Sequence, residues 1–133
     1  MKTIKEQLVS YFSKLENIEL IYLFGSETTG FTHPESDVDI ALLFNIDKVP
    51  ETGRLMQIQD DLTSLLKKEV DIVVLNNASP IIRMQILRKG KKLIERNRRV
   101  FINFFTRTVN EYDDLKRVRS VIEKKIARGR IYG

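Results

Sequence analysis

The chain has 133 residues, and its 42% hydrophobic and 31% charged content is typical of a soluble globular protein that forms one domain. It contains no cysteine, which excludes disulfides, thiolate metal sites and a cysteine nucleophile, and its single histidine excludes a histidine-rich metal site. No apolar run approaches membrane-spanning length, and the first residues lack a signal-peptide pattern. We therefore expect a cytoplasmic protein with no membrane partner.

The net charge of +5 is unevenly distributed along the chain. Residues 96–133 contain 11 Lys/Arg and four Asp/Glu, whereas the rest of the chain contains 12 and 14. We expect a single domain over residues 1–133, with a catalytic core over about 1–95 and a helix with a basic tail over about 96–133. The basic end would suit RNA or an acidic protein surface, but a solvated helix face explains it as well.

The first elements read as a helix followed by two strands. Thr3 and Glu6 have the spacing of a capping box, and apolar residues at helical spacing continue the pattern over about residues 4–15. Two apolar runs then predict strands over Ile18–Phe24 and about Asp37–Phe44. Both faces of the second strand are largely apolar, so we expect helices to cover it on both sides.

The rest of the chain alternates helices with short strands. A serine cap followed by proline marks one helix start at Ser79-Pro80, and apolar residues at helical spacing indicate a long C-terminal helix. The expected elements are a helix over about Gly53–Lys68 with Lys67 and Lys68 in its last turn, a strand over Glu69–Leu75, a helix from Pro80 to near Lys89-Gly90, a short strand over Lys92–Glu95, a helix over about Arg98–Ala127, and a flexible tail over Arg128–Gly133.

Two aspartates stand near the start of the second strand. Side chains alternate along a strand, so Asp37 and Asp39 point to one face, roughly 6–7 Å apart. At an effective dielectric of about 20 their repulsion is roughly 2–3 kcal/mol, which favours either open water or a cation between them. Mg²⁺ prefers such carboxylate oxygens, completed by water and phosphate. Asp71, in the next apolar strand, is a candidate third ligand, although each aspartate could also be a solvated residue at a strand end.

A glycine and a serine precede the aspartates, with ten residues between Ser26 and Asp37. Gly25 ends the first strand, where the missing Cβ lets the backbone turn sharply and approach a ligand. Ser26 would open a short helical turn over Ser26–Thr29 and present its hydroxyl and free N–H groups to an anion. A plain turn glycine with a capping serine explains the local structure but not the carboxylates downstream. The pattern is neither a Walker A loop nor a dinucleotide fingerprint.

This combination of an apolar strand, Gly25-Ser26, Asp37-x-Asp39 and Asp71 resembles the polymerase-β-type nucleotidyltransferase superfamily. The length and spacing resemble its smallest branch, the minimal nucleotidyltransferases (MNT). The resemblance implies an α/β (α+β) fold, with a mixed β-sheet packed by helices. It also implies that the three aspartates hold two Mg²⁺ ions, and that Gly25 and Ser26 bind the β- and γ-phosphates of ATP. Asp71 would further help to orient or deprotonate the acceptor hydroxyl.

The resemblance also implies a partner. MNT family members act as antitoxins that transfer AMP from ATP to a tyrosine hydroxyl of a HEPN-domain ribonuclease toxin and form a hetero-oligomer with it. A short chain without its own acceptor domain fits that role. Transfer to RNA or a small molecule, or neutralisation by binding alone, are the alternatives. Five basic residues are candidate phosphate contacts among which the sequence does not choose: Arg83, Arg88, Lys89, Lys91 and Lys92.

Overall fold

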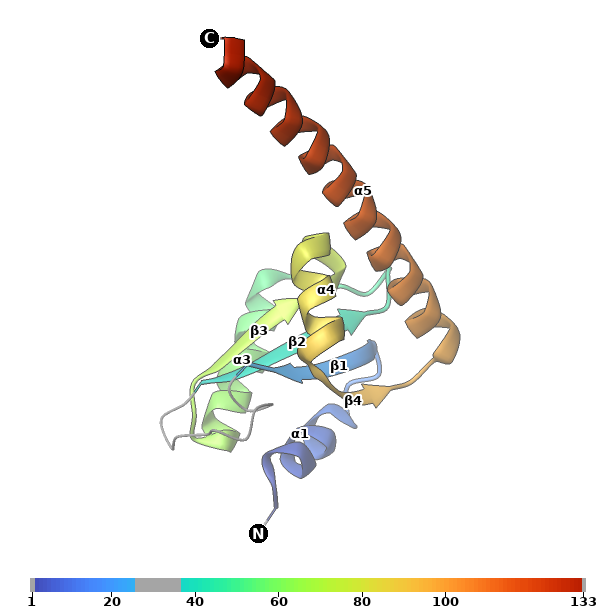
Figure 1. Ribbon diagram of the computed structural model, residues 1–133. Coiled ribbons are helices and arrows are strands. Elements are labelled where there is room, and N and C mark those ends of the chain that lie inside the picture. The colour runs from blue at the N-terminus through green and yellow to red at the C-terminus, as the bar shows by residue number, and fades with distance from the viewer. Residues whose placement is uncertain (1, 26–36, 133) are drawn as a thin grey trace.

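The computed structural model describes residues 2–25 and 37–132, and their side chains as far as residue 128. It contains a four-stranded sheet with helices on both faces (Figure 1). In chain order the elements are α1 (Ile4–Phe12), β1 (Ile18–Phe24), β2 (Val38–Phe44), α3 (Thr52–Leu66), β3 (Val70–Val74), the 3₁₀ helix η1 (Leu75–Asn77), α4 (Pro80–Lys89), β4 (Lys91–Glu95) and α5 (Arg98–Tyr132). The expected α/β fold with a long C-terminal helix is confirmed.

The sheet is mixed, with the strand order β3-β2-β1-β4. Strand β1 runs antiparallel to both β2 and β4, and β2 runs parallel to β3. The end of β1 therefore lies at the same edge of the sheet as the starts of β2 and β3. This arrangement brings together the residues at the end of β1 and at the starts of β2 and β3.

Two apolar clusters lie on opposite faces of the sheet. One face carries Val38, Ile40 and Leu42 of β2 and is covered by α1 and α3. The other carries Ala41 and Leu43 and is covered by η1, α4 and α5. Since side chains alternate along a strand, both faces of β2 must be apolar to be buried in this way. The prediction of a doubly covered strand is confirmed.

The helix ends follow local chemistry, with two corrections. The hydroxyl oxygens of Thr3 and Ser79 accept the N–H groups of Glu6 and Ile82, as the capping patterns predict. Helix α1 stops at Phe12, earlier than expected. The prediction that α3 continues through its lysines was wrong: it ends at Leu66, and Lys67 adopts the left-handed conformation at φ 56°. That conformation reverses the chain quickly enough for β3 to begin at Val70.

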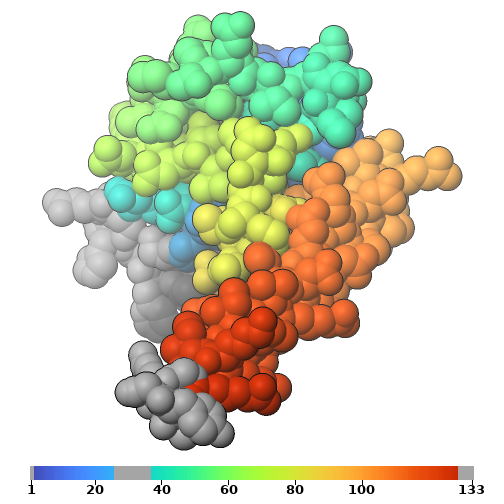
Figure 2. Space-filling view, turned by 90° about the horizontal axis from the view of Figure 1, so that it is seen from above, coloured from blue at the N-terminus to red at the C-terminus, as the bar shows by residue number. Residues whose placement is uncertain are grey.

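Helix α5 is longer than predicted and leaves the body of the protein. It continues to Tyr132, so the expectation of a flexible tail from Arg128 was wrong. Phe104 and Thr108 in its first half are buried, whereas Leu115, Val118, Val121, Ile122 and Ile126 further along are exposed. Figures 1 and 2 show this second half standing away from the sheet and its covering helices. No helix among the described residues combines the length and the apolar character needed to cross a membrane.

Two side chains tie together segments that are far apart in the sequence. The side-chain amide of Asn76 accepts the N–H of Phe44 and donates to its carbonyl oxygen, at 2.9 Å each. The guanidinium of Arg96 donates to the carbonyl oxygens of Phe12, at 2.6 Å, and Leu15. These bonds add hydrogen-bond partners to backbone groups at the end of β2 and just after α1, where regular secondary structure stops.

Candidate active site

The candidate site lies at the edge of the sheet where β1 ends and β2 and β3 begin. Phe24, the last residue of β1, pairs with Asp39 on β2, and Asp39 pairs with Asp71 on β3. Residues paired across neighbouring strands point to the same face. Asp39 alternates with Ala41 and so faces the side that α4 and α5 cover. The structure therefore brings Asp39 and Asp71 together on that face.

Asp37 lies immediately before β2 and is exposed. The next residue, Val38, donates its N–H to the carbonyl oxygen of Glu69 at 2.9 Å, which holds the start of β2 against the start of β3. Asp37 is two residues from Asp39, and its charge acts on that carboxylate. All three aspartates named from the sequence thus lie at one edge of the sheet.

The electrostatics of the site are those of crowded carboxylates. Partial burial, followed by the charges of Asp71 and Asp37, raises the pKa of Asp39 above its ordinary value. Each of these causes disfavours the ionised form of Asp39, and a bound cation would favour it. Within the described parts of the chain, no three acidic or histidine side chains are close enough together to hold a metal ion as they stand. A bound ion would have to draw these carboxylates closer.

Gly25 directly contacts this group. Its φ of +83° lies in the left-handed region that L-residues rarely adopt. A Cβ built on it would be 2.3 Å from Oδ2 of Asp39, well inside van der Waals contact. The position thus requires glycine for two independent reasons, and the turn brings backbone within reach of the central carboxylate. Ser26 and the predicted turn over Ser26–Thr29 lie outside the described residues.

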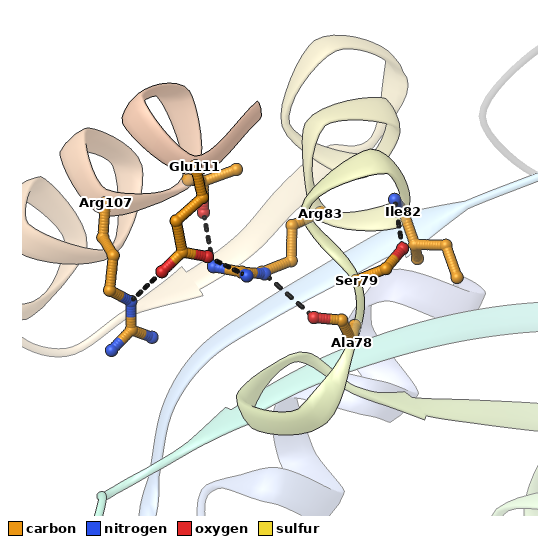
Figure 3. A network of polar contacts seen from close by, with 7 residues as sticks. Ala78, Ser79, Ile82, Arg83, Arg107 and Glu111 are labelled. Carbon is orange, nitrogen blue, oxygen red and sulfur yellow. Dashed lines mark hydrogen bonds and ion pairs between the residues drawn. The ribbon is translucent and has the colours of Figure 1, made fainter. Parts of the chain in front are cut away.

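The candidate phosphate contacts divide once their neighbours are known. Arg83 is buried and donates to the carbonyl of Ala78 at 3.1 Å, to Thr108 Oγ1 at 3.3 Å and to the carboxylate of Glu111 (Figure 3). Its donors join α4 to α5, so Arg83 serves packing and not phosphate binding. Thr108 and Glu111 are polar residues on the face of α5 that packs against α4. Their presence on that face was the signal in the sequence for a basic partner such as Arg83.

Two other candidates also have partners on α5. The guanidinium of Arg88 lies over the ring of Tyr112, 5.4 Å from its centroid. Lys92 pairs with Glu95 at 2.7 Å and lies over the ring of Phe101. The remaining two, Lys89 and Lys91, are exposed at the end of α4 and the start of β4. The start of β4 pairs with the end of β1, and Lys91 is in register with Leu23, whose side chain lies on the face of the sheet opposite Asp39.

A glycine turn against carboxylates from neighbouring strands is an arrangement suited to holding a triphosphate and a divalent cation. The family described as "Polymerase beta, Nucleotidyltransferase" matches residues 6–99, which include every site residue named above. The chain belongs to this nucleotidyltransferase family, in the branch of the minimal nucleotidyltransferases.

One relative and two solved structures show the likeness in detail. The protein adenylyltransferase MntA of Shewanella oneidensis is 33% identical over 108 residues, which cover 81% of this chain and 76% of that protein. A toxin–antitoxin crystal structure with AMP-PNP has 27% identity and a TM-score of 0.78, and the match covers 92% of this chain and 98% of that one. In the structure of the tri-AMPylated Shewanella oneidensis HEPN toxin in complex with MNT antitoxin, the matching chain has 25% identity and a TM-score of 0.74. This match covers 93% of this chain and 96% of that one.

Proposed function

We propose that this protein is a cytoplasmic antitoxin that transfers AMP from ATP to a tyrosine hydroxyl of a cognate HEPN ribonuclease toxin, releasing pyrophosphate and neutralising the toxin. The observation that carries the proposal is the register of Asp39 with Asp71 beside Gly25, in a chain 33% identical to a protein adenylyltransferase. In this proposal residues 1–133 act as one nucleotidyltransferase domain.

Each site residue has a task in this reaction. The backbone at Gly25 approaches the β- and γ-phosphates, because the absent side chain leaves them room beside Asp39. Ser26 adds its hydroxyl and N–H to the same phosphates. Asp71, on the neighbouring strand, orients the acceptor hydroxyl and takes its proton as the oxygen attacks the α-phosphorus. The pyrophosphate then leaves from the opposite side of that phosphorus.

Asp37, Asp39 and Asp71 would hold the divalent cation, for which Mg²⁺ is the fitting choice, with two ions expected. The fit is chemical: three hard oxygen donors stand at one edge, and burial together with the charges of Asp71 and Asp37 raises the pKa of Asp39, whose ionised form a bound cation would favour. When bound, Mg²⁺ offsets the negative charge that develops on the attacking and leaving oxygens. The protein itself contributes position and exclusion of competing nucleophiles, so little covalent chemistry falls to its side chains.

The test uses ATP labelled at the α-phosphate, Mg²⁺, and the HEPN protein encoded beside this chain. We expect label on the HEPN protein, at a tyrosine, and a loss of its ribonuclease activity. Asp39→Asn should form the same complex without transferring label. Label that appears only on RNA or on a small molecule would refute the protein acceptor, and inhibition of the toxin without labelling would show that binding alone neutralises it.

A further inference from the structure

The second half of α5 carries an apolar stripe that stays exposed among the residues that the structure describes. On the first half, Phe104, Thr108 and Glu111 lie on the face that packs against the sheet and α4. Continuing at the same helical spacing, that face consists of Leu115, Val118, Ile122 and Ile126. These four side chains are 42%, 56%, 51% and 51% exposed. The face that packs α5 against the rest of the protein thus continues into a segment where its apolar residues are exposed. We call residues 113–128 the arm.

The start of the arm follows from the contacts between α4 and α5. Thr108, Glu111 and Tyr112 are the last residues of α5 seen to contact α4, through Arg83 and Arg88, so the arm begins where α5 leaves α4. Gly90, just after α4, lies against Tyr22 of β1: a Cβ built there would be 3.2 Å from Cδ1 of the ring.

Tyr22 is two residues before Phe24, the pairing partner of Asp39. Helix α5 packs on the face of the sheet that Asp39 and Asp71 share. Figure 1 shows the arm rising from that side of the molecule above α4. A protein seated on the apolar stripe would lie in the angle between the arm and the body.

The charges of the arm indicate what kind of partner fits. Residues 113–128 contain six Lys/Arg and three Asp/Glu, and Glu123 is already engaged by Arg119 at 3.4 Å. Two copies of the arm packed together would concentrate positive charge on both sides of the seam, which disfavours self-association. A partner helix with an apolar face and acidic residues beside it would complement both the apolar stripe and the basic residues of the arm.

We infer that the arm is the docking surface for the toxin, which packs an apolar, acid-flanked helix against Leu115, Val118, Ile122 and Ile126. This rests on the proposed function and adds the surface that brings the acceptor to the site. Because one rigid helix joins the arm to the catalytic body through the Arg83 network in Figure 3, docking on the arm sets the position of the acceptor hydroxyl.

The experiment compares Ile122→Glu with Val121→Glu in the full-length chain. Both residues are apolar, adjacent and equally exposed, at 51% and 52%, but only Ile122 lies on the stripe. With the co-encoded HEPN protein titrated by calorimetry, Ile122→Glu should raise Kd about 30-fold or more, and Val121→Glu less than about threefold. Circular dichroism should show both variants as helical as the wild type.

The transfer reaction separates docking from catalysis. Ile122→Glu should label the toxin slowly at low toxin concentration and reach the wild-type rate at saturation, whereas Asp39→Asn should bind normally and label nothing. If the wild type binds and labels the toxin but Ile122→Glu binds equally well, the docking surface is wrong and the proposed function stands. A wild type that neither binds nor labels the toxin refutes both. A chain that dimerises alone, and becomes monomeric with Ile122→Glu, assigns the stripe to a second copy and overturns the inference.

Discussion

Replacing Gly25 with alanine tests the geometry of the site most directly. The substitution adds one methyl group at a backbone with φ +83°, where its Cβ would be 2.3 Å from Oδ2 of Asp39. The left-handed conformation costs an L-residue about 1–2 kcal/mol. Moving the carboxylate or the backbone aside costs a further 1–3 kcal/mol, roughly as overpacking does in a core. Restricting the unfolded chain returns about 0.4–1 kcal/mol.

The net loss should therefore be about 1–5 kcal/mol, or roughly 3–15 °C in Tm for a domain of this size. Function should suffer more than stability, because the atom that must move belongs to the central carboxylate. A displacement of about 1 Å is enough to reduce the rate of transfer on the order of 100-fold. Stability is measured by thermal unfolding, and transfer by labelling the HEPN protein from labelled ATP.

Gly53→Ala is the matched control for this experiment. Gly53 lies in the first turn of α3, and a Cβ there meets nothing within 4 Å. Alanine should leave transfer unchanged and stabilise the protein by up to about 1 kcal/mol through helix propensity. The reasoning about Gly25 is refuted if Gly25→Ala melts and transfers like the wild type, or if the two glycine substitutions behave alike.

Three further predictions concern other groups. The pKa of Asp39 is raised, so the folded state holds a proton that the unfolded state releases, and stability falls as the pH rises from 3.8 to the folded value. Asp39→Asn should therefore melt above the wild type at pH 7 and lose that advantage below pH 3.8, in thermal scans; a lower Tm at pH 7 would contradict this. Glu111→Ala leaves a buried guanidinium without its carboxylate and should cost about 1–3 kcal/mol in urea unfolding, while Glu123→Ala, which breaks an exposed pair, should be silent. Equal effects of these two would refute the distinction. Asn76→Ala removes both hydrogen bonds to Phe44 and should cost about 1–3 kcal/mol by the same measurement, and an unchanged midpoint would mean that water replaces them.

The strands and the position of the aspartates were predictable from the sequence because both depend on short-range periodicity. A period of two places Asp37 and Asp39 on one side of β2, and the apolar residues between them require cover on both sides. Asp71 was a candidate third ligand from the sequence, but its pairing with Asp39 was not predicted. The residues of β3 and its neighbours do not determine which strand β3 pairs with or in which register, because the pairing depends on the path of the chain through α3.

The departures have physical causes that act over longer distances. Lys67 belongs to a residue type that favours helices, yet the short connection to β3 forces it into the left-handed conformation. Arg83 looked like a phosphate ligand because its partners, Thr108 and Glu111, lie 25 and 28 residues further along the chain. Helix α5 continues past Ala127 to Tyr132, although a flexible tail was predicted from Arg128.

The two bonds from Arg96 to the carbonyls of Phe12 and Leu15 have a consequence for the order of assembly. Strand β1 is among the first parts of the chain to be made, but it occupies an interior place in the sheet and has one neighbour, β4, that begins only at Lys91. Arg96, which donates these bonds, comes one residue after the end of β4. The N-terminal helix therefore gains these two hydrogen bonds only after most of the domain has been made, and pairings over such long sequence separations slow folding. A nascent chain interrupted before this point would expose the apolar face that α1 later covers.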